Sequence, residues 1–334
     1  MNRRKFLLAA PALAACTADR RPRLNVFNWS AYIDPAMLRR FEQEYGVRIR
    51  YGTYESNEEM LARVMSGNSG WDVVFPTHGR LGPMATHGLL APLDHSLLTT
   101  PPNLAPRFQA PVWDPALRWA VPYMWNGTGI AWNSTQVSAP TTWSALWQDG
   151  LRGRITMLDD PEDVLGACLL KLGFPFSSTD ETQLLAARAE AIRQKELLRA
   201  YLNGDVRDQL VSGDVLAAQL WSSTTALAIA GNSALKFCWP NDGFPLYCDC
   251  AAILSESPRQ LLAHHFLNFL LRPEVAAANA KVAASATAVS TGQSTTDPVL
   301  YPPDEIYARG FWPPALPAAA QRYRDRLWTE IKSA

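Results

Sequence analysis

Strand and helix patterns alternate near the start of the chain, and this alternation constrains the fold more than any other feature. Residues 24–28 alternate apolar and polar side chains as a strand does, and Asp34 and Pro35 then supply the N-cap and first position of a helix. Residues 47–51 and 71–76 have the composition of two further strands, with helical patterns between. Strands joined by helices run parallel with right-handed crossovers. The sequence therefore predicts an open α/β sheet.

The remaining chain continues this α/β pattern, and 334 residues are too many for one small domain. A stretch containing glycine and asparagine at 123–134 interrupts the pattern and indicates a crossing between two lobes. Further strands are expected at 154–160, 215–223 and 246–254, and a final helix from about Pro317. We expect two α/β lobes joined by more than one crossing, with a cleft between them.

The N-terminus has the features of an export signal. Residues 1–15 combine Arg3, Arg4 and Lys5 with a short apolar run that ends in small residues. This run is too short to span a bilayer, and the basic start resembles a twin-arginine signal. The four residues that end at Cys16 resemble a bacterial lipobox, in which that cysteine is acylated. The alternative is a plain secretory signal followed by an incidental cysteine.

Charge excludes one class of partner. The first fifteen residues carry three of the 31 positive charges and none of the 31 negative ones, so the exported chain is slightly acidic. Nucleic-acid binding needs a basic face, and we therefore expect no nucleic-acid partner.

Four cysteines follow Cys16 in the sequence, namely Cys168, Cys238, Cys248 and Cys250. Export would permit a disulfide. Cys238 and Cys248 flank a Pro-Asn-Asp-Gly turn pattern between two expected strands, so they could face each other. Buried free thiols are the alternative that we expect.

Signatures of catalysis are missing. The sequence contains no Walker A loop, no GxGxxG after a strand, no HExxH and no GxSxG. Its five histidines form no i, i+4 pair. We therefore expect no enzymatic activity, no cofactor and no metal site.

Several candidate binding residues share one position in the pattern, where a strand ends or beside the expected crossing. Open α/β sheets bind ligands in the crevice beyond the carboxyl ends of their strands. Aromatic faces attract ammonium groups, and carboxylates accept charge-assisted hydrogen bonds from them. These side chains together predict a cleft for an organic amine, and they are Trp29, Tyr32, Thr77, Asp159, Asp160, Asp163, Trp221, Tyr247 and Asp249.

Most of these residues also have a purely structural interpretation. Trp29 and Tyr32 could close the core, as could Trp221 and Tyr247. Asp160 precedes Pro161, which makes it a good helix N-cap.

Asp249 is harder to explain structurally. It lies between Cys248 and Cys250 in an otherwise apolar strand, where neighbouring side chains point to opposite faces. If the cysteines face the core, Asp249 faces a cleft or solvent.

Several segments carry a resemblance, in order, over nearly the whole exported chain. They are VFNWSAYID, YGTYESNEEM, WDVVFPT, LDDPEDV with KLGF, LNFLLRPEVA and LYPPDE. They resemble the periplasmic spermidine/putrescine-binding proteins of ABC transporters. The resemblance implies the two-lobed periplasmic-binding-protein fold, with a hinge and an interlobe cleft that closes on a linear polyamine. Position by position, the ligand-binding residues it implies are Trp29, Ser30, Tyr32, Thr77, Asp160, Asp163, Trp221, Tyr247 and Asp249.

Five positions depart from that family. Ala31 stands where spermidine binders often have a carboxylate, and Gly79 and Arg80 stand where family members have tyrosines. Ser285 replaces an aromatic residue and Pro313 a polar amide. A shorter diamine, another amine-bearing solute, and a ligand with an acidic group that meets Arg80 all remain open.

We therefore expect a monomeric, periplasmic, lipid-anchored protein that captures a polyamine-like amine for an ABC-transporter permease. A sensory protein that signals to a membrane receptor is the alternative, as is a binder of a different small solute. An enzyme on the same fold would need a base or metal site that the sequence lacks. The expected division is signal 1–15, tether 16–23, lobe 1 at 24–126 with 251–293, and lobe 2 at 127–250 with 294–334.

Overall fold

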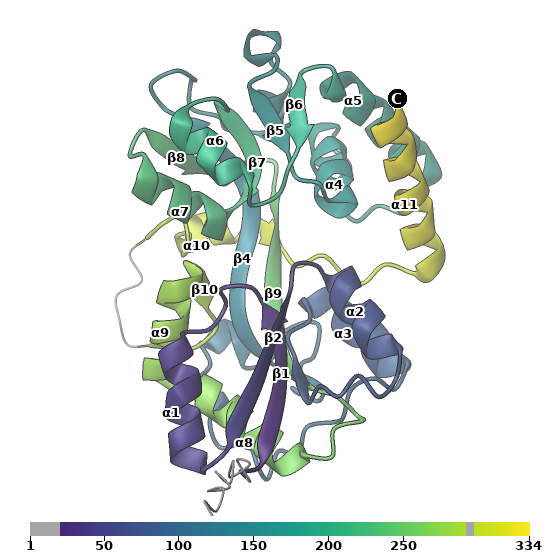
Figure 1. The fold of residues 1–334 in the computed structure, drawn as a ribbon. Coiled ribbons are helices and arrows are strands. Elements are labelled where there is room, and N and C mark those ends of the chain that lie inside the picture. The colour runs from purple at the N-terminus through teal and green to yellow at the C-terminus, as the bar shows by residue number, and fades with distance from the viewer. Residues whose placement is uncertain (1–20, 292–296) are drawn as a thin grey trace, which may run out of the picture.

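A computed structural model describes residues 21–291 and 297–334, and the expected signal and Cys16 lie outside these ranges. The chain forms two α/β lobes, one above the other, joined by two long neighbouring strands (Figure 1). These strands are β4 (Ala120–Asn133) and β9 (Phe244–Ile253), which pair antiparallel from Ala120 to Gly127 of β4. The glycine- and asparagine-containing stretch is thus a crossing between lobes.

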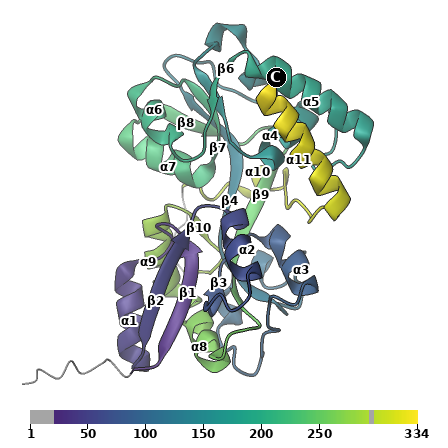
Figure 2. The same cartoon turned by 45° about the vertical axis from the view of Figure 1, so that its right-hand side comes forward.

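Lobe 1 contains the sheet order β2-β1-β3-β9-β4. The pairs β1–β2 and β1–β3 are parallel, which confirms the expected β-α-β units. Helices α1, α8 and α9 lie on one side of this sheet, and α2 and α3 on the other (Figure 2). The elements of lobe 1 are β1 (Arg23–Trp29), α1 (Pro35–Tyr45), β2 (Arg48–Tyr54), α2 (Asn57–Met65), β3 (Val73–Val74), α3 (His78–Thr86), α8 (Gln260–Leu270), α9 (Pro273–Ala283) and β10 (Ala286–Thr287).

Lobe 2 continues the sheet from β4 in the order β4-β7-β5-β6, and β8 also pairs with β4. Helices α6 and α7 lie on one side, and α4, α5 and α11 on the other (Figures 1 and 2). Its elements are β5 (Ile155–Met157), α4 (Pro161–Lys171), α5 (Glu181–Lys195), β6 (Leu198–Tyr201), α6 (Val206–Ser212), β7 (Ala217–Trp221), α7 (Ser222–Gly231), β8 (Leu235–Cys238) and α11 (Ala318–Ser333), with α10 (Asp304–Tyr307) and β11 (Gly310–Phe311) before α11.

Close approach of the chain at the crossing depends on Gly127. A Cβ atom there would lie 2.6 Å from the Trp239 ring and 2.9 Å from the carbonyl oxygen of Pro245. Gly127 pairs with Leu246 of β9, so the two crossing strands need a residue without a side chain at this point. The expected lobe boundaries at 126/127 and 250/251 fall within these two strands and stay predictions.

The expected pairing of the strands around Cys238 and Cys248 is wrong. Both strands pair with β4 instead, where Cys238 lies opposite Ile130 and Cys248 opposite Trp125. They occupy successive stretches of one long strand, so the turn between them does not form a hairpin. The four cysteines of the described chain are free thiols, and Cys168, Cys248 and Cys250 are buried.

Candidate functional site

Asp249 is the best-defined polar residue at the junction of the lobes. Its carboxylate accepts hydrogen bonds from the Tyr32 hydroxyl at 2.8 Å and from the Thr77 hydroxyl at 2.9 Å. Only 6% of Asp249 is exposed. The thiols of Cys248 and Cys250 lie 3.8 Å apart and fully buried, as strand alternation requires if Asp249 faces the other way.

The environment of Asp249 perturbs its protonation. Burial raises the pKa of this carboxyl to about 6, although hydrogen bonds from Tyr32, Thr77 and Trp29 act in the opposite direction. A buried carboxylate without a cationic partner costs free energy, and a ligand ammonium group would supply that partner.

The end of β1 brings the first pair of predicted aromatics to this place. The indole Nε1 of Trp29 donates to the Phe75 carbonyl oxygen at 2.8 Å, and its ring lies 4.7 Å from that of Tyr54. Both Trp29 and Tyr32 are half-buried and pack against the core, so they are partly core residues as well. Between them, Ala31 adopts a left-handed conformation with φ of 54°, and the hydroxyl of the half-buried Ser30 donates a hydrogen bond to Glu55.

Lobe 2 contributes three carboxylates from the start of α4. Asp160 is the N-cap, and its side chain accepts from the backbone N–H groups of Glu162 and Asp163 at 2.8 and 3.0 Å. Its structural interpretation is therefore confirmed. Asp163 is buried and accepts a hydrogen bond of 3.2 Å from the Tyr247 hydroxyl.

Burial, together with the charges of neighbouring carboxylates, raises the pKa values of these three groups. Burial and the charge of Asp160 raise the pKa of Glu162 to about 7, while Arg80 and Arg324 act in the opposite direction. Burial, Asp160 and Glu162 raise the pKa of Asp163 far above its usual range. Such a group of carboxylates favours a positively charged ligand.

Glu162 was missed by the sequence reasoning. An acidic residue in the first turn of a helix is common, because it complements the helix dipole, so its presence carries no signal of binding. Its position between Asp160 and Asp163 was the only available clue.

Tyr247 and Asp249 lie two residues apart on β9 and therefore on the same face of the strand. Tyr247 contacts Asp163 of lobe 2, whereas Asp249 contacts Tyr32 and Thr77 of lobe 1. Trp221 ends β7, is half-buried and packs against a small core cluster of lobe 2.

Besides Ala31, the four other departing positions differ in their surroundings. A Cβ atom at Gly79 would meet nothing within 4 Å, and Arg80 forms an ion pair of 3.0 Å with Glu58. The Ser285 hydroxyl donates to the Trp125 carbonyl oxygen at 3.1 Å, and the carbonyl oxygen of Pro313 lies 3.0 Å from Nε2 of His78.

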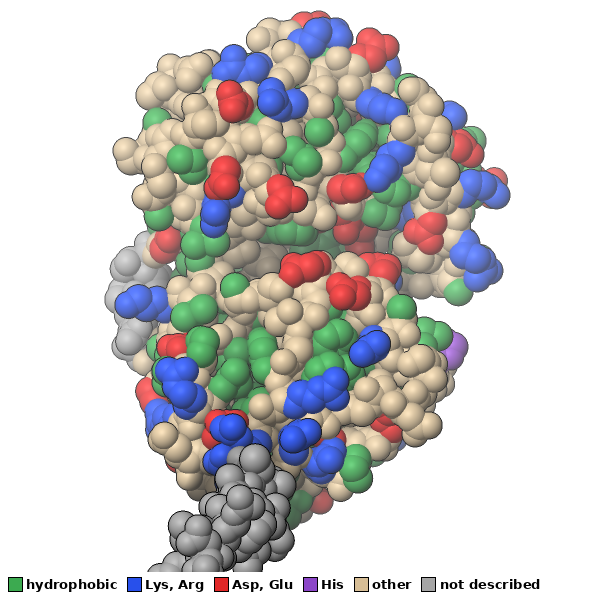
Figure 3. Space-filling view, viewed as in Figure 1, with side chains coloured by type: hydrophobic (Ala, Val, Ile, Leu, Met, Phe, Trp, Pro, Cys, Tyr) green, Lys and Arg blue, Asp and Glu red, His purple; other side chains and the backbone are tan. Residues whose placement is uncertain are grey.

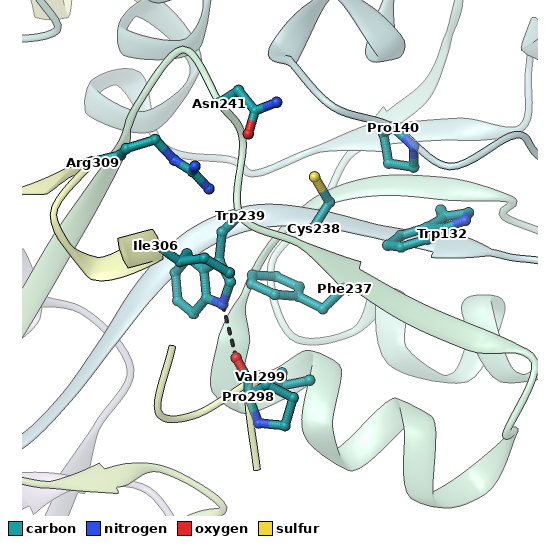
Figure 4. Close-up of a pocket in the computed structure, with 10 residues that line it drawn as sticks. All are labelled: Trp132, Pro140, Phe237, Cys238, Trp239, Asn241, Pro298, Val299, Ile306 and Arg309. Carbon is teal, nitrogen blue, oxygen red and sulfur yellow. Dashed lines mark hydrogen bonds between the residues drawn. The ribbon is translucent and has the colours of Figure 1, made fainter. Parts of the chain in front are cut away.

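A hollow separates the lobes in the space-filling view, with acidic side chains on both of its rims and hydrophobic ones within it (Figure 3). A second cavity, of about 320 Å³, lies in lobe 2 (Figure 4). It is lined by the aromatic residues Trp132, Phe237 and Trp239, with Arg309 beside them. None of the predicted site residues lines this second cavity.

Two α/β lobes joined by paired strands, with polar and aromatic side chains at their junction, define a two-lobed binding protein. The chain belongs to the bacterial extracellular solute-binding proteins, because the model of that family matches residues 36–300. Within the described ranges, no helix is long and apolar enough to cross a membrane. In the same ranges no cluster of histidine, cysteine and acidic residues could hold a metal ion.

Curated relatives cover nearly the whole chain. The spermidine/putrescine-binding periplasmic protein of Escherichia coli is 30% identical over 96% of this chain and 96% of its own length. The putrescine-binding periplasmic protein PotF of the same organism is 30% identical over 98% of this chain and 95% of its own. A putative spermidine/putrescine ABC transporter structure from Listeria monocytogenes superposes with a TM-score of 0.87, at 29% identity over 93% of this chain and 98% of that one. The two-lobed periplasmic-binding-protein fold is thus confirmed.

Proposed function

We propose that the protein captures a polyamine-like amine outside the cytoplasm and delivers it to an ABC-transporter permease. The observation that carries this proposal is Asp249, a buried carboxylate whose only cationic partner would be a ligand. Two hydroxyl donors fix its orientation, and no Lys or Arg ion pair is found for it among the described residues. The names of the relatives support the same ligand class.

The site residues divide into two ends of an elongated ligand. One ammonium group binds Asp249, between Tyr32 and Thr77 of lobe 1. A second ammonium group binds Asp163 in lobe 2, where Tyr247 already donates to the same carboxylate. The faces of Trp29 and Trp221 then cover the methylene groups between them, and Ser30 and Asp160 lie at the rims. Binding to both lobes would favour the closed form of the hinge.

The departures at Ala31, Gly79 and Ser285 favour a ligand other than spermidine. Each removes a charged or aromatic contact, and Gly79 leaves open space where a side chain would stand. The proposal therefore covers diamines and related amines rather than one named polyamine.

The location of the protein in the cell and its attachment to the membrane are part of the same proposal. An export signal over residues 1–15 and acylation of Cys16 would hold the monomer on the outer face of the inner membrane. Residues 16–23 would then form the tether between the lipid and the first lobe.

A thermal-shift and calorimetry screen tests the proposal. The panel contains putrescine, cadaverine, spermidine, neutral amino acids and small dicarboxylic acids. At a hundredfold excess over Kd, a true ligand stabilises the protein by about 2.7 kcal/mol, so an amine is expected to raise the melting temperature. Binding of an acid or an amino acid, with no response to any polyamine, would refute the ligand class. Mass spectrometry of the recovered amine should show no turnover.

A further inference from the structure

Arg80 is a fixed positive charge at the rim of the candidate site. It lies in the first turn of α3, three residues after Thr77, whose hydroxyl bonds to Asp249. Its guanidinium Nη2 donates to Glu58 Oε1 at 3.0 Å, and 31% of the Arg80 side chain is exposed. The guanidinium is therefore held on lobe 1 by Glu58 and is partly exposed.

The charge of Arg80 acts on the opposite lobe. Helices α2 and α3 of lobe 1 face α4 of lobe 2 across the hollow (Figures 2 and 3). The guanidinium lowers the pKa values of both Asp160 and Glu162, whereas the Glu58 carboxylate raises them. Glu58, Arg80, Asp160 and Glu162 thus form one interlobe group of charges, in which Arg80 is the cation on the lobe 1 side.

This group divides the carboxylates of the site into two kinds. Asp249 and Asp163 bond to the hydroxyls of Tyr32, Thr77 and Tyr247, and neither forms an ion pair within the described residues. Asp160 and Glu162, in contrast, already interact electrostatically with a cation of the protein itself, Arg80. An ammonium group that entered beside them would meet the positive charge of Arg80.

We propose that Arg80 takes the place of one ligand ammonium group, so that the site selects amines with two ammonium groups over amines with three. The inference rests on the proposed function, since it names which members of that ligand class fit. When the lobes close, Arg80 approaches Asp160 and Glu162 and contributes the charge that a longer polyamine would otherwise bring. Two carboxylates, Asp249 and Asp163, remain for the ligand.

Calorimetry with putrescine and spermidine at one ionic strength tests this role. Two variants are compared that should shift the ratio of the two affinities in opposite directions. Wild-type protein should bind putrescine more tightly than spermidine. In Arg80→Gln the affinity for spermidine should rise by about tenfold relative to putrescine, because one repulsive charge is lost. In Glu58→Gln, Arg80 loses its neutralising partner, and the same ratio should move the other way. Arg63→Gln removes an exposed arginine from α2 of the same lobe and should leave the ratio unchanged.

The outcomes separate this inference from the function on which it rests. If wild-type protein binds neither amine, the proposed function fails. If it binds them but the ratio is the same in wild type, Arg80→Gln and Glu58→Gln, the role of Arg80 is refuted. If Arg80→Gln instead loses affinity for an amine that carries a carboxylate, Arg80 meets an acidic ligand group, which also overturns the proposal. Unchanged circular dichroism spectra confirm that each variant is folded.

Discussion

The Tyr32 hydroxyl donates a 2.8 Å hydrogen bond to Asp249, a residue 217 positions later in the chain. The bond joins the loop after β1 to the strand that crosses between the lobes. Tyr32 also accepts, through its backbone carbonyl, a 2.7 Å hydrogen bond from the Tyr123 hydroxyl at the other crossing strand. These two hydrogen bonds hold Tyr32 and Asp249 in place through contacts within the protein, and such preorganisation lowers the entropy lost on binding.

Asp249→Asn should lower amine affinity by well over tenfold. The substitution keeps the shape of the side chain but removes the charge that pairs with the ammonium group, and truncation of a buried charge pair costs about 2–5 kcal/mol. Isothermal titration with the best amine of the screen measures the loss. Asp208→Asn, at an exposed position on α6, is the matched control. Equal affinities in the two variants would remove Asp249 from the site.

Amine affinity should fall as the pH decreases from 8 to 5. Burial raises the pKa of Asp249 to about 6, so this carboxyl becomes protonated over this interval and no longer attracts a cation. Binding should release protons near pH 6, and titration in two buffers of different ionisation enthalpy measures this release. Affinity that is independent of pH would contradict the assignment of Asp249 to the ligand.

The ligand-free protein should respond to pH in the opposite sense. A raised pKa in the folded state means that the unfolded chain ionises first, so Asp249 contributes stability below about 3.8 that is lost as pH rises through about 6. Glu162 acts likewise between about 4.5 and about 7. Thermal melts of Asp249→Asn and wild type across this range isolate the contribution of Asp249. The variant should lose less stability than wild type as the pH rises from 4 to 7.

Trp29→Ala should weaken amine binding more than it destabilises the fold. Trp29 is half-buried at the end of β1, whereas Trp143 is fully buried and donates its indole N–H to the Gly243 carbonyl oxygen. Trp143→Ala should therefore cost about 3–5 kcal/mol of unfolding free energy, as large core truncations do. Chemical denaturation and calorimetry of both variants make the comparison. If Trp29→Ala destabilises the protein as much as Trp143→Ala, Trp29 is a core residue.

Gly127→Ala should strain the crossing between the lobes. The new methyl group would overlap the Trp239 ring and the Pro245 carbonyl oxygen, and overpacking of this kind costs about 1–3 kcal/mol. Gly150→Ala is the control, because a Cβ atom there meets nothing within 4 Å. Melting temperatures of the two variants give the difference. Equal values would show that the strands can move apart without cost.

Cys16→Ser should release the exported protein from membranes. Acylation needs the thiol, and no helix within the described residues is long and apolar enough to cross a membrane. Fractionation of cells that express each form, followed by immunoblotting, measures the distribution. Sedimentation of the serine variant with membranes would refute lipidation at Cys16.

The sequence predicted the fold well because its signals were local and periodic. The capped helix at Asp34 and the parallel strands around it are present as expected. The supposed hairpin after Cys238 failed for a non-local reason. The strands on either side of that turn, β8 and β9, both pair with the 14-residue strand β4. The residues of the turn itself carry no information about this partner.

Only part of the candidate site could be predicted from the sequence. Asp249 was identified because it is a carboxylate in an otherwise apolar strand, and this contrast can be recognised from the sequence alone. Glu162 was not identified from the sequence. Its pKa depends on burial and on the charges of Arg80 and Arg324, and both arginines lie far away in the sequence. Electrostatic surroundings depend on tertiary contacts and are therefore hidden from pattern analysis.

The two-residue spacing of Tyr247 and Asp249 has an evolutionary consequence. One strand presents both side chains, and each serves a different lobe. Substitution at either position can alter preference at one end of the cleft while the other end stays intact. Insertion or deletion of a single residue between them would instead rotate one side chain to the opposite face of β9. Point mutations in this strand can therefore change which ligand related proteins bind, whereas insertions or deletions between the two residues would disrupt the site.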